Sequence, residues 1–427
     1  MKSSPIAILT ASYISVAAVA APENTNGSEF GASVFLSSQH TDNARKSNDN
    51  KISELQNQLG AAVFADYEND YLALNADYSV SEMRYEKDSQ KTRTTTIGRT
   101  DFVLGKPHNA FDLKVSHSIQ KLPKFSGALD LEENKDEKQI LSVQPGFHKR
   151  ITAVDNLFIN ANATEVDYRF EEHKNSSRRG GTLGVIHNFS AVDSLTIYAS
   201  TTDVEFEYSP DVDYSQTMAV IAFESRLRKL GYRLEVGQSR TDSSMTGISE
   251  DPYYSLAINY DADFHQIGVR LNQLVTDSSR GFDAGVIAGD YDLGNDITAE
   301  QVDQVLLRHV DVRWESNALC SRCNFYISAY RDQHEFLSSD REEERIGAAL
   351  GFAYRLSPKA RIGINASRVE QEQKNETNNS EYTLDQLTAY YRYSFVNGSV
   401  AEHERSAANE NEEYTELRAG ITVSYRF

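Results

Sequence analysis

The sequence predicts an all-β protein, built as a single antiparallel up-and-down β-barrel of about 18–20 strands. Three observations lead to this fold class. Apolar and polar residues alternate with a period of two along nearly the whole chain, short turns alternate with longer polar segments, and no linker or shift in composition divides the 427 residues. A soluble β-sandwich of this length would normally be split into domains joined by linkers, so one closed sheet fits better.

The alternation is clearest in the last segment, from Glu416 to Phe427. One face carries Leu417, Ala419, Ile421, Val423, Tyr425 and Phe427, and the other carries Glu416, Arg418, Gly420, Thr422, Ser424 and Arg426. Similar segments occupy residues 72–80, 111–116, 195–199, 232–236, 346–355 and 361–366. The phase of the pattern changes within Thr164–Phe170, which predicts either a bulge or an exit from the membrane. Residues 281–301 and 398–407 are hard to assign, which leaves the strand number open.

Two kinds of connection alternate along the chain. Short turns are expected at 68–70, 106–109, 152–156, 191–193, 228–230, 261–263, 357–359 and 396–398. Longer polar segments are expected as loops at 40–50, 86–92, 122–136, 172–178, 240–251, 276–301, 371–380 and 405–412. Short turns at one end and long loops at the other are typical of outer-membrane barrels, and an even strand number places both termini on the periplasmic side.

The N-terminal residues have the pattern of an export signal. Residues 1–20 are mostly apolar after Lys2 and end in Ala18-Val19-Ala20, which predicts a signal peptide. An N-terminal membrane anchor is the alternative, but Thr10, Ser12 and Ser15 interrupt the run. We therefore expect a signal peptide at 1–20, a short periplasmic segment at 21–27 and the barrel at 28–427, placed in the outer membrane of a Gram-negative bacterium against lipid and lipopolysaccharide.

Composition agrees with a strand-rich, exported protein. Tyr (23) and Phe (19) are frequent, whereas the formal net charge is −20 and the mean hydropathy is −0.54. A barrel reconciles these values, because only its outward band must be apolar. Such an acidic chain is not expected to bind nucleic acid. The acidic stretches 130–138, 341–345, 370–381 and 402–413 are expected to be solvated loops, and Tyr390, Tyr391, Tyr393, Phe395, Tyr425 and Phe427 an interfacial girdle.

Cys320 and Cys323 are the two cysteines of the chain. In an oxidising compartment they are expected to form a disulfide in the turn between Glu315 and Asn324, with a free pair as the alternative. No further Cys or His cluster completes a zinc site, so neither metal nor another cofactor is expected.

The polar face of the strands gives the candidate pore lining. The expected inward residues are Asp77, Lys114, Arg233, Glu235, Arg270, His309, Asp311, Arg313, Arg392, Glu416, Arg418 and Arg426. Rings of charge can set ion preference, although such side chains can also pair across the lumen and only hold the barrel in shape. Basic residues outnumber acidic ones in this set, which favours anionic solutes.

Several segments resemble one known family. They are Gln39-His40-Thr41-Asp42-Asn43, Gln58-Leu59-Gly60-Ala61-Ala62, the strand Asp70 to Tyr78, Leu141 to Phe147 and the terminal Val423 to Phe427. Together they resemble the β-barrel porin type 2 family, which includes EpsL-type proteins of exopolysaccharide operons and outer-membrane proteins of PEP-CTERM systems. The family's Leu-Ser-Pro-Arg turn appears once, as Leu356-Ser357-Pro358-Lys359, and the cysteine turn departs from the pattern.

The resemblance implies polysaccharide export or a general porin, and it supplies no catalytic residues. The leading hypothesis is therefore a pore that assists exopolysaccharide export, with periplasmic export machinery as a possible partner. The alternatives are a diffusion porin for small anionic solutes and a structural or adhesive barrel with a closed lumen. An enzyme is not expected, because the histidines are scattered and no Ser-His-Asp or paired-carboxylate arrangement stands out.

Overall fold

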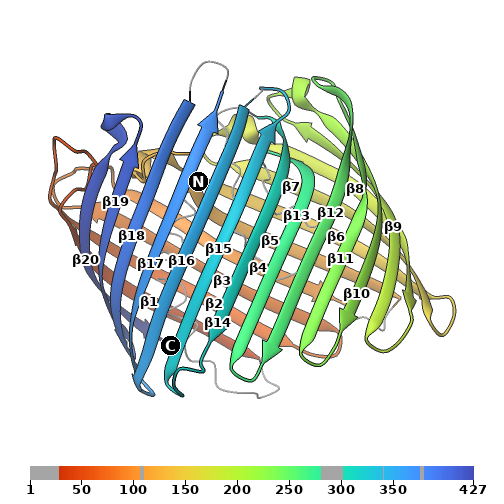
Figure 1. Cartoon of the computed structure of the whole chain (residues 1–427), viewed down its shortest axis with the longest axis horizontal. Coiled ribbons are helices and arrows are strands. Elements are labelled where there is room, and N and C mark those ends of the chain that lie inside the picture. Colours follow the sequence, from red (N-terminus) through yellow and green to blue (C-terminus); the bar gives the residue numbers. More distant parts are fainter. Residues whose placement is uncertain (1–27, 106–109, 280–301, 340, 376–378) are drawn as a thin grey trace.

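The computed structural model describes residues 28–105, 110–279, 302–339, 341–375 and 379–427. The signal peptide expected at 1–20 and the segment expected at 21–27 lie outside these residues. Twenty strands form one antiparallel sheet in which each pairs with its neighbours in the chain, and β20 pairs with β1 to close it (Figure 1). The predicted all-β, up-and-down barrel is confirmed, with the strand number at the upper end of the range.

The strands are 12 to 17 residues long. Their bounds are β1 Glu29–Thr41, β2 Glu54–Glu68, β3 Leu72–Tyr85, β4 Arg93–Leu104, β5 Phe111–Pro123, β6 Lys135–Arg150, β7 Asp155–Tyr168, β8 Ser176–Asn188, β9 Asp193–Phe206, β10 Tyr214–Arg226, β11 Leu230–Ser243, β12 Gly247–Ala262, β13 His265–Asp277, β14 Gln304–Ser316, β15 Cys323–Phe336, β16 Arg341–Ser357, β17 Ala360–Lys374, β18 Asn379–Tyr393, β19 Val396–Ala407 and β20 Tyr414–Arg426. Single 3-10 turns, η2 Glu132–Asn134, η3 Glu172–Lys174, η4 Pro210–Val212 and η5 Glu410–Glu412, lie in the longer connections.

The seam between the first and last strands is fully paired. Nine residue pairs join β1 to β20, from Ser33 with Arg426 to Thr41 with Arg418. The N–H of Phe427 also donates to the carbonyl of Ala32, and Arg426 forms an ion pair with Glu29. The seam therefore leaves no open edge, as a sheet in lipid requires.

The connections separate into a short-turn end and a long-loop end, as predicted. Two of the expected loops are shorter than the polar sequence suggested. Residues 240–251 are mainly the β11–β12 hairpin, in which only 244–246 lie between the strands, and β17 continues to Lys374 within the expected loop 371–380. Polar strands that extend beyond the lipid carry no apolar face, so their composition resembles that of a loop. The stretch 398–407, which was hard to assign, belongs to β19.

The outer surface is an apolar belt edged by aromatic rings. Ile159, Leu183, Ile197, Ile221 and Val236 are among the outward side chains that lie exposed. Large aromatic residues are exposed along the short-turn end, namely Phe30, Tyr71, Phe111, Phe189, Phe264, Phe395 and Phe427. An apolar band edged by aromatic residues is the exterior that a barrel presents to lipid and to the headgroup layer. Tyr390, expected in the girdle, instead faces inward over Gly363, because it shares its face of β18 with Arg392.

The phase change in Thr164–Phe170 marks an exit from the apolar belt. β7 pairs regularly with β6 and β8 in this region, so the expected alternative of a bulge is wrong. Glu165 and Asp167 point outward, whereas Val166 and Tyr168 are buried inside with Ile140. The outward face becomes charged where it leaves the lipid, and the inward face becomes apolar where it meets other chain segments. Among the described residues no helix has the length and apolar character to cross a membrane.

Candidate pore and its lining

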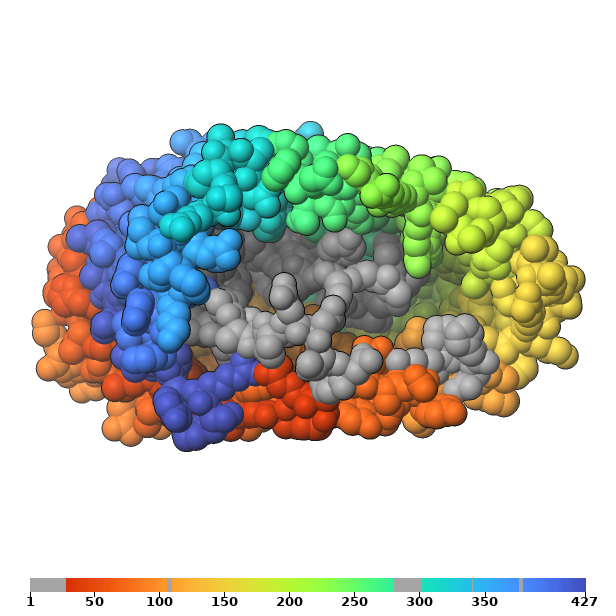
Figure 2. All heavy atoms as spheres, turned by 90° about the horizontal axis from the view of Figure 1, so that it is seen from below, coloured from red at the N-terminus to blue at the C-terminus, as the bar shows by residue number. Residues whose placement is uncertain are grey.

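The barrel has an elongated outline and a hollow interior when viewed from the short-turn end (Figure 2). The strand register places all twelve predicted lining residues on the inner face. They are Asp77 on β3, Lys114 on β5, Arg233 and Glu235 on β11, Arg270 on β13, His309, Asp311 and Arg313 on β14, Arg392 on β18, and Glu416, Arg418 and Arg426 on β20. Period-two alternation is enough to assign this inward facing, because one face of each strand must be apolar to meet lipid. That these residues line a pore stays a prediction.

Many of these side chains neutralise one another within the wall. The guanidinium of Arg233 lies 2.5 Å from the carboxylate of Glu235, and that of Arg270 lies 3.1 Å from Asp311. His309 is held between Asp311 at 2.9 Å and Asp332 at 2.5 Å. These groups therefore pair with neighbouring side chains of the barrel wall. This agrees with the alternative in which inward charges hold the barrel in shape.

The connection between β5 and β6 folds into the lumen. Residues 124–134, here called the inward segment, reach the opposite wall, where Gln371 of β17 donates to Ser126 and Tyr382 of β18 lies against Gly127. Gly127 has φ of +79°, a conformation that favours glycine. The segment therefore spans the lumen between β5 and β18.

Asp130 anchors the inward segment at its centre. Its carboxylate lies 2.6 Å from Lys135, 2.8 Å from Lys46 and 3.4 Å from Arg418, and Lys46 also approaches Glu416 at 3.6 Å. The expectation that 130–138 is a solvated loop is wrong, because Asp130 and Lys138 are buried. Lys46 and Arg418, from distant parts of the chain, help to compensate this acidic stretch, and their distance in the sequence hides the pairing.

Glu132 forms a second anchor next to Asp130. Burial alone would raise the pKa of its carboxyl, but the ammonium groups of Lys135 and Lys121, at 3.2 and 2.5 Å, outweigh burial and lower the pKa to about 2. The backbone N–H of Glu132 also donates to Gln90. The inward segment is thus fixed by charges that exist only while its carboxylates are ionised.

A pH titration tests this anchoring. Because the pKa of Glu132 falls from 4.5 to about 2 in the folded protein, its ion pairs stabilise the inward position fully above pH 4.5. The stabilisation decreases as the pH falls towards 2. We expect the single-channel conductance to rise between these pH values and to recover on neutralisation. A conductance that stays constant down to pH 2 would contradict the anchoring.

A second set of contacts joins the end of β13 to β7, β8 and β10. The end of β13 turns inward, so that Asp277 lies 2.6 Å from Arg178 of β8 and accepts from the hydroxyl of Tyr214 of β10 at 2.7 Å. The hydroxyl of Tyr168 donates to the carbonyl of Ser279. These residues begin the loop expected at 276–301, of which 280–301 lie outside the described residues.

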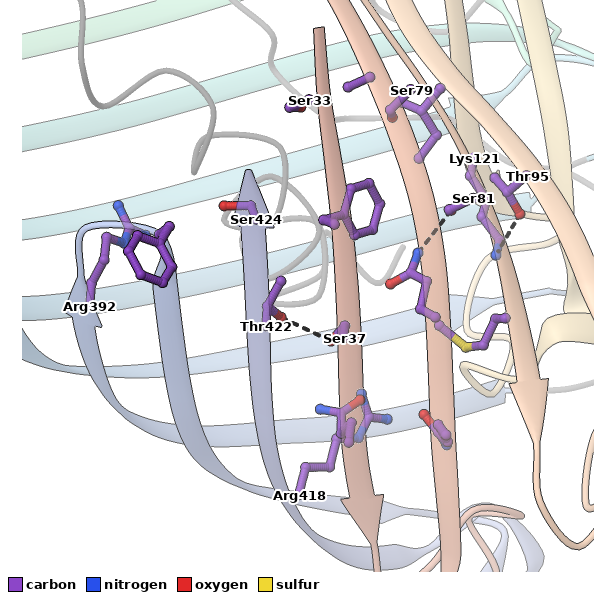
Figure 3. A pocket seen from close by; sticks show the side chains of 18 of the residues that line it. Ser33, Ser37, Ser79, Ser81, Thr95, Lys121, Arg392, Arg418, Thr422 and Ser424 are labelled. Carbon is purple, nitrogen blue, oxygen red and sulfur yellow. Dashed lines mark hydrogen bonds between the residues drawn. The ribbon is translucent and has the colours of Figure 1, made fainter. Parts of the chain in front are cut away.

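Beneath the inward segment lies a cavity of about 530 Å³ that extends to the short-turn end. Seryl, threonyl and glutaminyl side chains of β1, β2, β3 and β20 form much of one wall, with Ser33, Ser37, Ser79, Thr422 and Ser424 visible in Figure 3. Ten basic residues line it, against the four carboxylates of Asp77, Asp130, Glu132 and Glu416. The basic residues are Lys46, Arg93, Lys121, Lys135, Arg355, Lys359, Arg361, Arg392, Arg418 and Arg426. The cavity is therefore basic within a strongly acidic protein.

Sequence reasoning missed basic residues in loops and at strand ends, such as Lys46 between β1 and β2 and Lys135 at the start of β6. Arg355 and Arg361 lie in the alternating segments 346–355 and 361–366 but were not among the predicted lining residues. Alternation assigns a face to each residue, but only the register shows which residues of different strands lie side by side. No group of three or more potential metal ligands gathers within the part of the chain that the structure describes.

Cys320 and Cys323 form a disulfide in the β14–β15 turn, with their Cα atoms 5.1 Å apart. The predicted pair thus lies at the short-turn end. We expect that protein extracted from membranes takes up no thiol-alkylating reagent until it is reduced, and then takes up two labels. Intact mass spectrometry measures this directly. Labelling of two thiols before reduction would contradict the bond.

Comparisons with known proteins find similarity at the level of solved structures. No protein-family profile matches the sequence, and no curated protein matches it. The Pseudomonas aeruginosa OccK1 (OpdK) structure is 10% identical, with a TM-score of 0.43 over 93% of this chain and 99% of that one. The FrpB iron transporter of Neisseria meningitidis is 9% identical, with a TM-score of 0.43 over 92% and 82% of the two chains. Membership of the β-barrel porin type 2 family stays a prediction.

The membrane class follows from the geometry. A closed sheet satisfies every ladder hydrogen bond without an edge, which spanning strands need in lipid. Its exterior carries an apolar belt with an aromatic rim, and its interior is polar. Short turns lie at one end and longer connections at the other. The chain is a 20-stranded antiparallel β-barrel of the Gram-negative outer membrane.

Proposed function

We propose that the protein is an outer-membrane channel for small anionic solutes. The excess of basic over acidic side chains around the cavity carries this proposal. Anions gain favourable electrostatic energy in a basic passage with low-dielectric walls, and cations are disfavoured there. The acidic outer loops do not oppose this effect strongly, because charges separated by more than about 8–10 Å are screened at physiological salt.

The inward segment favours small solutes over a polymer. It spans the lumen and is fixed by Asp130, Glu132 and the contact of Ser126 with Gln371. An exopolysaccharide chain would need this segment to move away while the chain passes. Export of exopolysaccharide, with periplasmic machinery as a partner, is therefore the second candidate, since it requires a rearrangement that small solutes do not.

Liposome swelling tests the proposal. Proteoliposomes are placed in isotonic solutions of gluconate, of the similarly sized neutral sugar glucose, and of a long acidic oligosaccharide. We expect swelling with gluconate to exceed that with glucose, and no swelling with the oligosaccharide. Equal rates for gluconate and glucose would contradict anion preference, entry of the oligosaccharide would favour polymer export, and no swelling at all would favour a closed structural barrel.

A further inference from the structure

Three arginines stand side by side at the short-turn end of the cavity. Arg355 of β16 lies directly opposite Arg361 of β17, and Arg361 lies directly opposite Arg392 of β18. Directly opposed residues of antiparallel strands have Cα atoms about 4.5–5.5 Å apart, so their side chains occupy one patch. All three line the cavity. Their guanidinium groups therefore share a small region of the lumen wall.

This row lacks the carboxylates that neutralise other inward arginines. Arg270 pairs with Asp311 and Arg345 with Asp332. Within the described part of the chain, none of the three arginines of the row forms an ion pair, and the Nε of Arg392 is buried without a hydrogen-bond partner. Like charges directly opposite each other destabilise a sheet. An anion bound here would remove that repulsion and satisfy the Nε donor of Arg392.

The row continues along the wall as uncharged hydrogen-bonding groups. Arg392 lies directly opposite Asn397 of β19, and Asn397 lies opposite Thr422 of β20. The Oδ1 of Asn397 is buried without a partner, so an unsatisfied acceptor lies beside the unsatisfied donor of Arg392. The hydroxyl of Thr422 donates to that of Ser37 at 2.9 Å (Figure 3). Along the wall, the guanidinium groups are thus followed by the carboxamide of Asn397 and then by the hydroxyl of Thr422.

We propose that this row binds the carboxylate of a small hydroxylated organic acid. A guanidinium presents paired N–H donors that match the two oxygens of a carboxylate. The carboxylate binds Arg361 and Arg392, and a neighbouring hydroxyl of the solute donates to the Oδ1 of Asn397. Further hydroxyls reach the serine and threonine wall. This assignment rests on the proposed channel function, because it names the class of anion that the channel takes.

Isothermal titration calorimetry of the detergent-solubilised full chain tests the site independently of transport. The probes are gluconate, acetate, glucose and inorganic phosphate, and the variants are Arg361→Gln and Arg392→Gln. Arg99→Gln is the matched control, since it removes one inward arginine whose charge is already paired with Asp101 at 2.9 Å. We expect the wild-type protein to bind gluconate more tightly than acetate and to show no heat with glucose.

Loss of one charged hydrogen-bonding partner should weaken gluconate binding by about tenfold or more in Arg361→Gln and Arg392→Gln. The gluconate affinity of the Arg99→Gln control should stay within about twofold of the wild-type value, because an exposed ion pair has a small net effect. Arg361→Gln should melt at or above the wild-type temperature, because it relieves repulsion. A purely structural role would lower stability instead. If either variant misfolds, Arg361→Lys replaces it in the test. This variant retains the positive charge but lacks the paired N–H donors of a guanidinium, so it should still weaken gluconate binding.

The outcomes separate the two proposals. Wild-type protein that does not bind gluconate, or variants that bind it normally, would overturn the site while leaving the channel intact. Tighter binding of phosphate than of gluconate would overturn the carboxylate assignment. Binding that depends on Arg361 and Arg392, in a protein that passes no ions, would support the site and refute the channel.

Discussion

Replacing Asp130 by alanine is expected to free the inward segment and to increase the single-channel conductance. Asp130 is the shared partner of Lys46, Lys135 and Arg418, so its removal leaves these three cations to share the carboxylates of Glu132 and Glu416. Breaking a buried ion pair costs about 3–5 kcal/mol. We expect this cost to exceed what the remaining contacts of the segment, through Glu132 and Ser126, can offset, so the segment should leave the lumen. Conductance in a planar bilayer measures the effect.

Glu133→Ala provides the matched control for this change. Glu133 lies next to Glu132 in η2, is exposed, and carries the same charge. Its removal should leave conductance unchanged. An Asp130→Ala channel that conducts like the wild type would mean that the inward segment does not limit the pore.

Replacing Asp277 by alanine should produce the largest loss of stability. The carboxylate of Asp277 is buried and binds Arg178 in a bidentate pair, with Tyr214 and Ser279 as further donors. Without it Arg178 would be buried as an unpaired charge, at a cost of about 3–5 kcal/mol. Urea unfolding followed by the fluorescence of Trp314, the single tryptophan, measures the change.

Asp211→Ala is the control for the stability experiment, because Asp211 is exposed in η4 and lies outside the buried network. Its unfolding midpoint should match the wild type. An Asp277→Ala protein of unchanged midpoint would show that the inward turn of β13 contributes little to the folded barrel.

The fold was predictable from local sequence because lipid imposes the same rule on every strand. Leu417, Ile421 and Val423 face the membrane, and Glu416 and Arg418 therefore face the lumen. The same rule predicted the inward facing of all twelve candidate lining residues. It failed beyond the lipid, where residues 240–251 form a hairpin although they are polar.

The contents of the lumen were much harder to predict. Lys46 and Asp130 are 84 residues apart and meet only because two loops fold inward. The row formed by Arg355, Arg361 and Arg392 depends on the register of three strands, which period-two alternation does not fix. Predicting the charge networks inside a barrel thus requires the tertiary structure, whereas predicting which face of each strand points inward does not.

Zero-current potential across a planar bilayer under a potassium chloride gradient tests the central claim most directly. A basic passage should make chloride more permeant than potassium, and the potential should have the sign of anion selectivity. Gluconate added to one side should then reduce the chloride current. A potential with the sign of cation selectivity, or a folded barrel that passes no current, would contradict the proposed anion channel.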